Sequence, residues 1–450
     1  MKHIFKKLSM LAVAAVMCCS LAACGKGGGT DKDGNVIVQM SLMNSTNENP
    51  GWLAMIDAAN GVLERDGEKV RIEAEIIMTD SWDQYYTKVT SNILGKIGGT
   101  IGRIAESHMP QMVNKNQIAD LTEVRNALVE TGEYAADAFE GVAVKDGKYY
   151  GLPSGTQHMV LYYNKTIFDE YNKAHPEAPV DYPSGDWNNA STFEEIRETA
   201  KKLTSGSGAS KKFGLSAGPY LAYAGMYAKN SGGDNIFNAD GECVIATKPF
   251  YDVYEWFEDM LITDKSMPST SDTQTLDAMA RFLGGNIAMI IDGVWQIHDI
   301  CKYTGDSEIG VAAIPVAASG NVSYSTTFAD RFWASRNSPH PKEDKIALKA
   351  LMSAEAITAL SSKQIGGFPV REDCVDNYLS SIESTKLAGY VDVIKGGMAH
   401  KVSVPYSTYY NIVDQQINQK MATWINGDMS TKAFVDFMDE TMKKGMAGKL

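Results

Sequence analysis

The segment from Asp146 to Tyr171 reads DGKYYGLPSGTQHMVLYYNKTIFDEY. The glycines and the proline in its first half are typical of a turn, because they supply the backbone angles that a change of direction needs. The run from Val160 to Tyr163 contains only apolar and aromatic side chains, which favours a buried strand. The segment therefore predicts a turn that leads into a strand near the middle of the chain.

The rest of the chain alternates between strand patterns and helix patterns. Val70, Ile72 and Ile76 lie at alternate positions, as one face of a strand requires. Ser191 and Glu194 have the spacing of a capping box at a helix start. Alternation of this kind predicts an α/β fold with substantial parallel pairing. We expect further strands at 36–40, 70–78, 287–291 and 309–314, and helices at 52–65, 81–94, 192–203, 249–261 and 409–425.

Length and charge limit the class of protein. A chain of 450 residues exceeds what one compact core usually accommodates, so two domains are expected. The formal net charge is −13, and removal of Lys2, Lys6 and Lys7 would make it more negative by three, at −16. A protein with this much negative charge repels nucleic-acid phosphates and anionic lipid headgroups, so neither is an expected partner.

The N-terminus has the layout of a secretory signal, with lysines, an apolar run at 8–17 and then small residues. The run is shorter than the roughly 20 residues that a membrane-spanning helix needs. The stretch LAAC at 21–24 resembles the bacterial lipobox, which implies removal of 1–23 and a palmitate-bearing lipid on Cys24. We expect the Gly-rich segment 24–34 to form a flexible tether, with this lipid as the only link to the membrane.

Neither the cysteines nor any motif indicates a metal site or a catalytic site. Cys243, Cys301 and Cys374 lie far apart and are odd in number, so they predict buried apolar side chains, with one disulfide left open. No hydrolase elbow, zinc-protease motif or phosphate-binding loop occurs, and the histidines lack ligand spacing. The sequence predicts no metal, no cofactor and no catalytic residue.

The segment 146–171 resembles the most recognisable part of the family 1 extracellular solute-binding proteins, the group that contains maltose-binding protein. In that family a G-K-x-Y-G-x-P turn leads into a strand ending Tyr-Tyr-Asn-Lys and a helix with an early Phe. Other short segments resemble the family in the same order along essentially the whole mature chain. The matching positions are Gly147, Lys148, Tyr150, Gly151, Pro153, Tyr163, Asn164, Lys165, Phe168, Trp187, 192–195, 282–289, 293–295, 311–315, 366–371 and 426–430.

The resemblance implies the α/β, two-lobed class II periplasmic-binding-protein fold, with a hinge that is crossed more than once. By the family pattern, lobe 1 comprises 35–155 and 316–364, and lobe 2 comprises 156–315 and 365–450. It also implies a monomeric substrate-binding lipoprotein of an ABC importer, which delivers a sugar or oligosaccharide to a membrane permease. We expect it on the outer face of a bacterial cell membrane, in a Gram-positive organism, without enzymatic activity.

A sugar offers hydroxyls at the rim of its ring and C–H bonds on the face, so its binding sites pair aromatic rings with fixed polar groups. The resemblance implies Trp295 as the leading stacking residue, with a core tryptophan as the alternative. Tyr220 resembles a stacking tyrosine, although Tyr220, Tyr223 and Tyr227 also have the spacing of a buried helix stripe. The resemblance further implies Gln157 as a hydroxyl-binding residue, together with His158, Tyr409 and Tyr410.

Residues near the ends of strands are further candidates, because open α/β sheets bind ligands there. Asn44 follows the first strand and Trp82 follows the second. In the segment from Gly98 to Arg103 the family's Gly-x-Pro-Asp pattern is missing, and we expect its Gly cluster to form a turn. That departure affects the edge of the cleft in lobe 1 and any transfer of the family's sugar contacts to Glu106 or His108. Two later residues, Asp330 and Trp333, are also predicted to bind substrate.

Three alternatives to a sugar importer stay open at this point. The cargo can be another polar solute, such as glycerol phosphate or a polyamine, and a polyamine would suit the acidic charge. A secreted carbohydrate-active enzyme would need two carboxylates around one glycosidic bond, and no motif marks such a pair. A sensor lipoprotein would pass ligand status to a membrane receptor.

Overall fold

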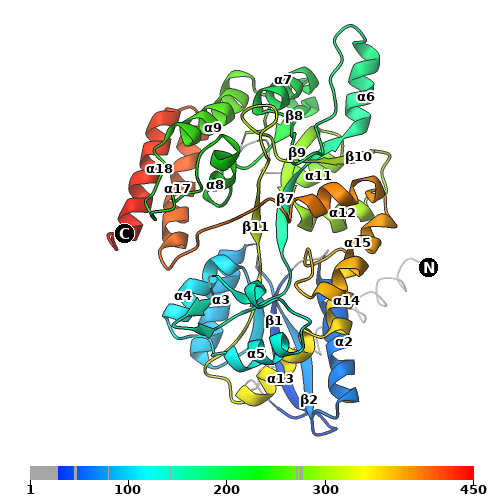
Figure 1. Ribbon diagram of the computed structural model, residues 1–450, viewed down its shortest axis with the longest axis vertical. Coiled ribbons are helices and arrows are strands. Elements are labelled where there is room, and N and C mark those ends of the chain that lie inside the picture. Colours follow the sequence, from blue (N-terminus) through cyan, green and yellow to red (C-terminus); the bar gives the residue numbers. More distant parts are fainter. Residues whose placement is uncertain (1–28, 45–47, 80, 142, 270–271, 273–276) are drawn as a thin grey trace, which may run out of the picture.

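The structure is a computed structural model that describes residues 29–44, 48–79, 81–141, 143–269, 272 and 277–450. These residues form two α/β lobes, each built on its own sheet and stacked along the long axis of the molecule (Figure 1). Lobe 1 holds the blue and cyan elements, and lobe 2 holds the green and red ones. The predicted signal peptide and Cys24 lie outside the described residues. The α/β, two-lobed fold predicted from the sequence is confirmed.

The sheet of lobe 1 has the order β2 (Val70–Ile77), β1 (Val36–Met43), β3 (Ile101–Ile104), β12 (Arg331–Ala334) and β6 (Leu152–Pro153). β1 pairs in parallel with β2 and β3, whereas β12 is antiparallel to β3 and β6. A separate hairpin joins β4 (Val144–Lys145) and β5 (Lys148–Tyr149). The carboxyl ends of β1, β2 and β3 therefore lie at the same edge of the sheet.

Helices cover both faces of this sheet. The buried side chains of the lobe accordingly form two clusters, one on each face. Met55, Ala59 and Val62 follow helical spacing and bury one stripe of the first helix against β1 and β2. The helices on that face are α2 (Asn49–Arg65), α5 (Thr122–Glu130), α13 (Pro341–Leu351) and α14 (Ala354–Ser361), and those on the other are α3 (Trp82–Gly95) and α4 (Met109–Asn114).

The sheet of lobe 2 has the order β13 (Lys401–Ser403), β11 (Ser325–Phe328), β7 (Gln157–Asn164), β9 (Ile287–Gly293) and β8 (Phe213–Ser216), with β10 (Ile309–Ala312) also paired to β7. β7 contains the predicted strand 160–163 and extends it at both ends. Met159 to Tyr162 are completely buried, because strands flank β7 on both sides and helices cover the sheet. The central segment of the sequence is thus the central strand of this lobe.

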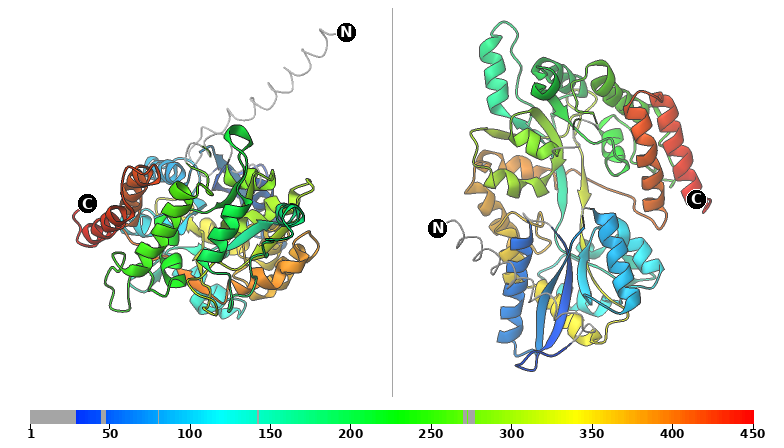
Figure 2. Two further views of the ribbon diagram at one scale, coloured as in Figure 1. Left: turned by 90° about the horizontal axis from the view of Figure 1, so that it is seen from above. Right: turned by 180° about the vertical axis from the view of Figure 1, so that it is seen from behind.

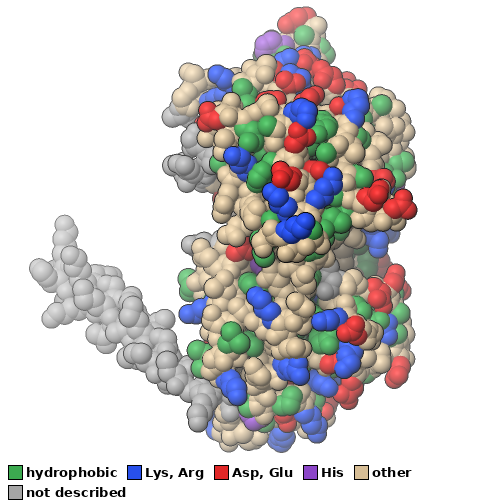
Figure 3. All heavy atoms as spheres, turned by 90° about the vertical axis from the view of Figure 1, so that its left-hand side faces the viewer, with side chains coloured by type: hydrophobic (Ala, Val, Ile, Leu, Met, Phe, Trp, Pro, Cys, Tyr) green, Lys and Arg blue, Asp and Glu red, His purple; other side chains and the backbone are tan. Residues whose placement is uncertain are grey.

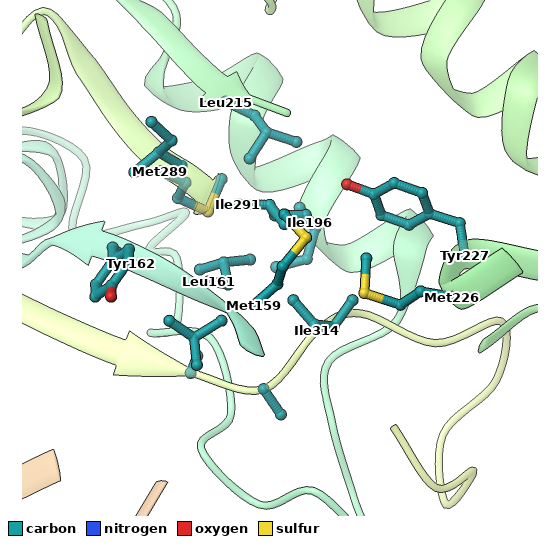
Figure 4. Packing of buried hydrophobic residues seen from close by; sticks show 14 of the residues in the cluster. Met159, Leu161, Tyr162, Ile196, Leu215, Met226, Tyr227, Met289, Ile291 and Ile314 are labelled. Carbon is teal, nitrogen blue, oxygen red and sulfur yellow. The ribbon is translucent and has the colours of Figure 1, made fainter. Parts of the chain in front are cut away.

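Helices pack around this second sheet and share one large core with it. Figure 4 shows Met159 and Leu161 of β7 in that core, near Ile196 and Met226 from two of the helices. Seen from behind, the two C-terminal helices stand together at one side of the lobe (Figure 2). The helices are α6 (Lys165–Ala174), α7 (Phe193–Leu203), α8 (Leu221–Asn230), α9 (Lys248–Glu258), α11 (Ala278–Leu283), α12 (Ile297–Lys302), α15 (Val375–Glu383), α16 (Val391–Gly396), α17 (Tyr410–Ile425) and α18 (Thr431–Met446).

Described segments pass between the lobes at three places, namely from β6 to β7, from β11 to β12, and after α14. The first two run side by side, since Gln157 pairs with Phe328 and the Ser154 amide donates to the carbonyl of Asp330. At the third place, Phe368 exchanges two backbone hydrogen bonds with Thr156. A Cβ on Gly155 would lie 2.1 Å from a carbonyl oxygen, so this close approach requires glycine.

The second passage lies later in the chain than predicted. Val316 packs in the core of lobe 2, and β11 pairs with β7 and β13. The side chain of Asn230 also holds the backbone of Tyr324 through two hydrogen bonds. Residues 316–328 therefore lie on lobe 2, not on lobe 1 as the family pattern implied, because they supply a strand to its sheet.

Several local predictions need correction. The capping box of α7 pairs Thr192 with Glu195, one residue later than predicted. Residues 101–104, at the end of the predicted Gly turn, form strand β3 between β1 and β12, and Gly102 leaves room for the ring of Trp333. At the end of the predicted tether, Asp31 accepts hydrogen bonds from the backbone of Asp33 and Asn35 and forms a turn before β1.

Figure 3 shows that the outline of the molecule narrows between the two lobes, and that acidic and basic side chains are interspersed on this face. Within the described part of the chain, every helix falls short of the length and apolar character needed to cross a membrane. The three cysteines in this part are free thiols, and Cys374 is buried.

Candidate substrate-binding cleft

A cavity of about 520 Å³ lies between the lobes and takes its lining from both. Lobe 1 contributes the carboxyl end of β1, the start of α3, β3 and the short helix η1 (Glu106–His108). Lobe 2 contributes α8, the turn after β9 and the start of α17. The lining residues are Met43, Glu48, Ser81, Trp82, Asp83, Arg103, Ala105, Ser107, His108, Gln157, Ala222, Tyr223, Trp295, Phe328, Asp330, Tyr406, Tyr410, Asn411 and Asp414.

Aromatic rings line the cavity from both lobes. Trp82 comes from lobe 1, and Trp295 comes from lobe 2, where its ring packs edge-on against Phe328 at 5.7 Å. A Cβ on Gly293 would lie 2.1 Å from the Trp295 ring, so glycine at this position lets the indole fold back over the chain. Tyr406 and Tyr410 pack together at 4.7 Å between ring centroids. Flat apolar surfaces are therefore present on two sides of the cavity.

Arg103 connects the wall of lobe 1 to the passage between the lobes. Its Nε donates to Asp330 at 2.9 Å, and its Nη1 donates to Glu48 at 3.3 Å. The guanidinium carbon lies 4.3 Å from the ring centre of Trp52 and 5.1 Å from that of Trp82. Burial raises the pKa of Asp330 above its usual range, while the charge of Arg103 opposes that rise. The network fixes both carboxylates and one face of Trp82.

His108 and Asn411 form a direct contact between the lobes. Nδ2 of Asn411 donates to Nδ1 of His108 at 2.8 Å, so the imidazole proton resides on Nε2, 3.4 Å from Asp83. Burial lowers the pKa of His108 to about 4, although the charge of Asp83 acts in the opposite direction. The imidazole is therefore neutral near pH 7, and its ring stacks on Tyr86.

Two other polar groups of lobe 2 shape the lining. Burial, and secondarily the charge of Asp83, raises the pKa of Asp414 to about 6. The buried hydroxyl of Tyr410 has no hydrogen-bond partner among the described residues. A buried hydroxyl without a partner is costly, so a polar ligand in the cavity would relieve this cost.

A second cavity of about 440 Å³ adjoins the first, and Tyr223 lines both. It lies within lobe 2 and is also lined by Tyr220 and Asp292. Burial raises the pKa of Asp292 to about 6, and this carboxylate accepts hydrogen bonds from the Gly293 amide and from Gln296.

The structure brings several predicted site residues together. Trp82, Gln157, Trp295, Asp330 and Tyr410 all line the main cavity, although they come from five separate segments of the chain. Tyr220 lines the second cavity and is 48% exposed, because it precedes α8 instead of lying on the buried stripe of that helix. Tyr227, four residues after Tyr223 on α8, is buried in the core. Tyr220 therefore lies at a cavity, whereas Tyr227 belongs to the buried stripe of the helix.

Other predicted site residues lie elsewhere. His158 is completely buried beside Phe368 and Trp187, because successive side chains of a strand face opposite ways and Gln157 takes the cavity side. Trp333 is completely buried in lobe 1 against Gly102, which corrects the prediction of a cleft residue.

Three more predicted residues lie close to the cavity but outside its lining. Asn44 lies just beyond Met43, and Tyr409 packs near Gly445. Glu106 is buried near Arg331, and burial raises its pKa to about 7, against the attraction of that guanidinium. The three side chains are not part of the described cavity lining, and their role in binding stays a prediction.

The sequence reasoning missed much of the polar lining, namely Glu48, Asp83, Arg103, Asn411 and Asp414. Asn411 and Asp414 lie three residues apart, and Asp414 lies one turn after Tyr410, so they share a helix face with a predicted residue. That spacing was a usable signal. Arg103 occupies the segment where the family pattern is interrupted, so the resemblance carried no information about it.

Among the described residues, no group of three or more His, Cys, Asp or Glu side chains is arranged to hold a metal ion. The lining instead offers rings, amides, hydroxyls and carboxylates, which are groups that bind an organic solute through stacking and hydrogen bonds.

Solved structures of other proteins share the fold of this chain. An ABC substrate-binding protein from Listeria monocytogenes, solved in complex with cycloalternan, has a TM-score of 0.75 at 20% identity, with 91% of this chain and 99% of that chain covered. The GacH receptor of Streptomyces glaucescens, solved unliganded and with acarbose, has a TM-score of 0.72 at 17% identity, with 91% and 98% covered. Maltose-bound MalE3 of T. maritima has a TM-score of 0.71 at 17% identity, with 90% and 99% covered.

Curated sequences and a family model define the relationship further. Binding proteins of Brucella abortus strain 2308 and Brucella suis biovar 1 are 23% identical over 265 residues, which is 57% of this chain. The match spans only 58% of the length of these curated relatives. The family model described as bacterial extracellular solute-binding protein matches residues 58–391, which is well over half of the chain. The chain therefore belongs to the bacterial extracellular solute-binding proteins.

Proposed function

We propose that this protein is the substrate-binding component of an ABC importer and that it captures a sugar or oligosaccharide between its lobes. The observation that carries the proposal is the position of Trp82 and Trp295, which come from opposite lobes and line one cavity. Gln157 and Asn411 line the same cavity and supply amide donors and acceptors for hydroxyl groups. This combination of rings and amides suits a sugar, which has apolar faces and a polar rim.

The solved relatives support this class of cargo. The proteins from Listeria, Streptomyces and T. maritima were solved with cycloalternan, acarbose and maltose, all of which are saccharides. Because these proteins are at most 20% identical to this chain, the structural similarity shows the shared fold and does not identify a particular ligand. A second cavity beside the first, with Tyr223 in the lining of both, offers additional room and favours an oligosaccharide over a single sugar ring.

Capture requires that the ligand stabilise the closed arrangement of the lobes more than the open one. Hinge closure of periplasmic binding proteins is a known example of this behaviour. Two of the passages between the lobes are short, spanning only 154–156 and 329–330, and short paired connections of this kind suit a hinge. The closed, loaded protein would dock on a membrane permease, and an affinity near micromolar, about −8 kcal/mol, is the expected range.

Attachment to the membrane is proposed through a lipid on Cys24, with the folded part outside the cell. Replacing Cys24 with Ala should release the protein into the medium and abolish labelling by palmitate in the producing bacterium. Retention of the variant on the membrane would contradict the lipid anchor and leave sugar binding untouched.

The central experiment is a thermal-shift screen of the mature protein against neutral oligosaccharides, spermidine and glycerol 3-phosphate, followed by calorimetry of each hit. A ligand that binds only the folded state raises stability by about 2.7 kcal/mol at 100 times its Kd. A shift with an oligosaccharide supports the proposal. A shift with spermidine or glycerol 3-phosphate alone would overturn the choice of cargo.

The family and the solved neighbours are binding proteins, which favours capture over catalysis. A carbohydrate-active enzyme would cleave a bound glycan, so incubation of the screening hit with the protein, followed by chromatography, separates the two functions. Recovery of the intact glycan supports transport, and a cleaved product would overturn it.

A further inference from the structure

The charges around the main cavity are unequal. Carboxylates from four residues line it, namely Glu48, Asp83, Asp330 and Asp414. The cationic residue types in the described lining are Arg103 and His108. The balance of formal charge in this part of the lining is therefore negative.

Neither basic residue is available to neutralise an anionic ligand. Arg103 already forms ion pairs with Asp330 and Glu48, so its charge is matched by two carboxylates. His108 accepts a hydrogen bond from Asn411 through Nδ1, which requires the neutral imidazole. An acidic group on a ligand would therefore meet no uncompensated positive charge among the described lining residues.

Two of the carboxylates come from different lobes, and both line the cavity. Asp83 comes from the first turn of α3 in lobe 1, and its side chain is 83% exposed. Asp414 comes from the second turn of α17 in lobe 2. His108 lies 3.4 Å from Asp83 and accepts a hydrogen bond from Asn411, which lies three residues before Asp414 on α17, so the two carboxylates flank the same contact between the lobes. Closure of the lobes would bring any ligand between them and remove the water that screens them.

We infer that the cleft selects an uncharged saccharide and that Asp83 and Asp414 exclude acidic saccharides, such as uronates and sugar phosphates. The inference rests on the proposed function, since it assigns a substrate class to the same cleft. Burial of a carboxylate between two others carries a desolvation cost without a compensating partner. Neutral hydroxyls carry no such penalty, and they are able to donate hydrogen bonds to both aspartates.

The first test compares matched ligands that differ only in charge. Calorimetry is performed with maltotriose and with its derivative oxidised to carboxylates at C6, and likewise with galactotriose and trigalacturonate. We expect the acidic member of each binding pair to bind at least about tenfold more weakly, or not at all. Equal or tighter binding of the acidic member would overturn the inference while leaving sugar capture intact. If neither pair binds and no sugar in the wider screen binds, the proposed function is overturned as well.

The second test assigns the selectivity to the two aspartates. In Asp83→Asn, Asp414→Asn and the double variant, the affinity ratio of acidic to neutral ligand should rise, by about tenfold in the double variant. Asp57→Asn is the matched control, since Asp57 is exposed on α2 and lines a separate surface pocket. An unchanged ratio in the double variant would overturn the role of this pair. Added salt should improve binding of the acidic ligand only, because salt screens charge repulsion.

Discussion

Asn411 in lobe 2 donates a hydrogen bond to His108 in lobe 1, at 2.8 Å, and both residues line the cavity between the lobes. The two residues are far apart in the chain, and the contact joins a short helix that follows β3 to the first turn of α17. His108 is held in place by stacking on Tyr86, so the contact has one rigid partner. This hydrogen bond therefore joins the two lobes within the lining of the cavity.

Asn411→Ala should favour the open arrangement of the lobes, because one hydrogen bond between them is lost. A net contribution of about 1 kcal/mol corresponds to a roughly fivefold weaker affinity for the best oligosaccharide. Small-angle scattering of the free and loaded variant reports lobe closure, and calorimetry reports affinity. Gln419→Ala on the exposed side of the same helix is the control. A variant with unchanged affinity and scattering would show that the contact has no part in closure.

Trp295→Ala and Trp82→Ala should each weaken sugar binding by about tenfold or more, since each removes a flat surface in the cavity. Substitution by Phe should retain part of the affinity, because a smaller ring remains. Tyr182→Ala, at an exposed site in lobe 2, should leave affinity unchanged. Calorimetry with the best ligand is the measurement. If Trp295→Ala binds as well as the parent protein, the leading stacking residue has been misassigned.

Arg103→Met should destabilise the protein by about 3–5 kcal/mol, because Glu48 and Asp330 would lose their shared partner. Loss of the guanidinium raises the pKa of Asp330 further above its usual range. A carboxyl group with a raised pKa in the folded state makes the fold less stable as the pH rises towards that pKa. The loss in free energy of unfolding, measured by urea unfolding, should therefore be larger at about pH 8 than at about pH 5. Arg65→Met, which breaks a solvent-exposed ion pair with Glu355, should leave stability almost unchanged. Equal deficits in both variants would contradict the role of the network.

His158→Leu should remove part of the acid sensitivity of the fold. Burial lowers the pKa of His158 to about 3, below the usual value of 6.5, so the unfolded chain binds more protons between these values. Stability is then lost as pH falls below about 6.5, by about 3 kcal/mol between about pH 7 and pH 4. Chemical unfolding across this range should show a shallower slope in the variant. The opposite pKa shift of Glu106 acts equally in both proteins and cancels from the comparison. An identical slope in the variant would contradict the burial argument.

The two-lobed architecture was predictable because its signals are local. The alternation of strand and helix patterns and the motif around β7 depend on neighbours in the sequence, and the structure has these elements within a few residues of the predicted bounds. The second passage between the lobes was predicted too early in the chain. Whether 316–328 joins one lobe or the other depends on contacts with distant residues such as Asn230, which the local sequence does not show. Residues 101–104 became a strand because β1 and β12 flank them, and no local pattern records those neighbours.

For the cleft, the sequence by itself determined the kinds of residue available, and five of the predicted residues line the cavity, namely Trp82, Gln157, Trp295, Asp330 and Tyr410. Only the tertiary structure decided which side of each element faces the gap, as the adjacent pair Gln157 and His158 shows. It also decided that Asp83 and Asp414, which come from different lobes, line the same cavity. The physical reason is that a strand or helix specifies its own two faces, whereas the packing of whole lobes determines which face meets the ligand.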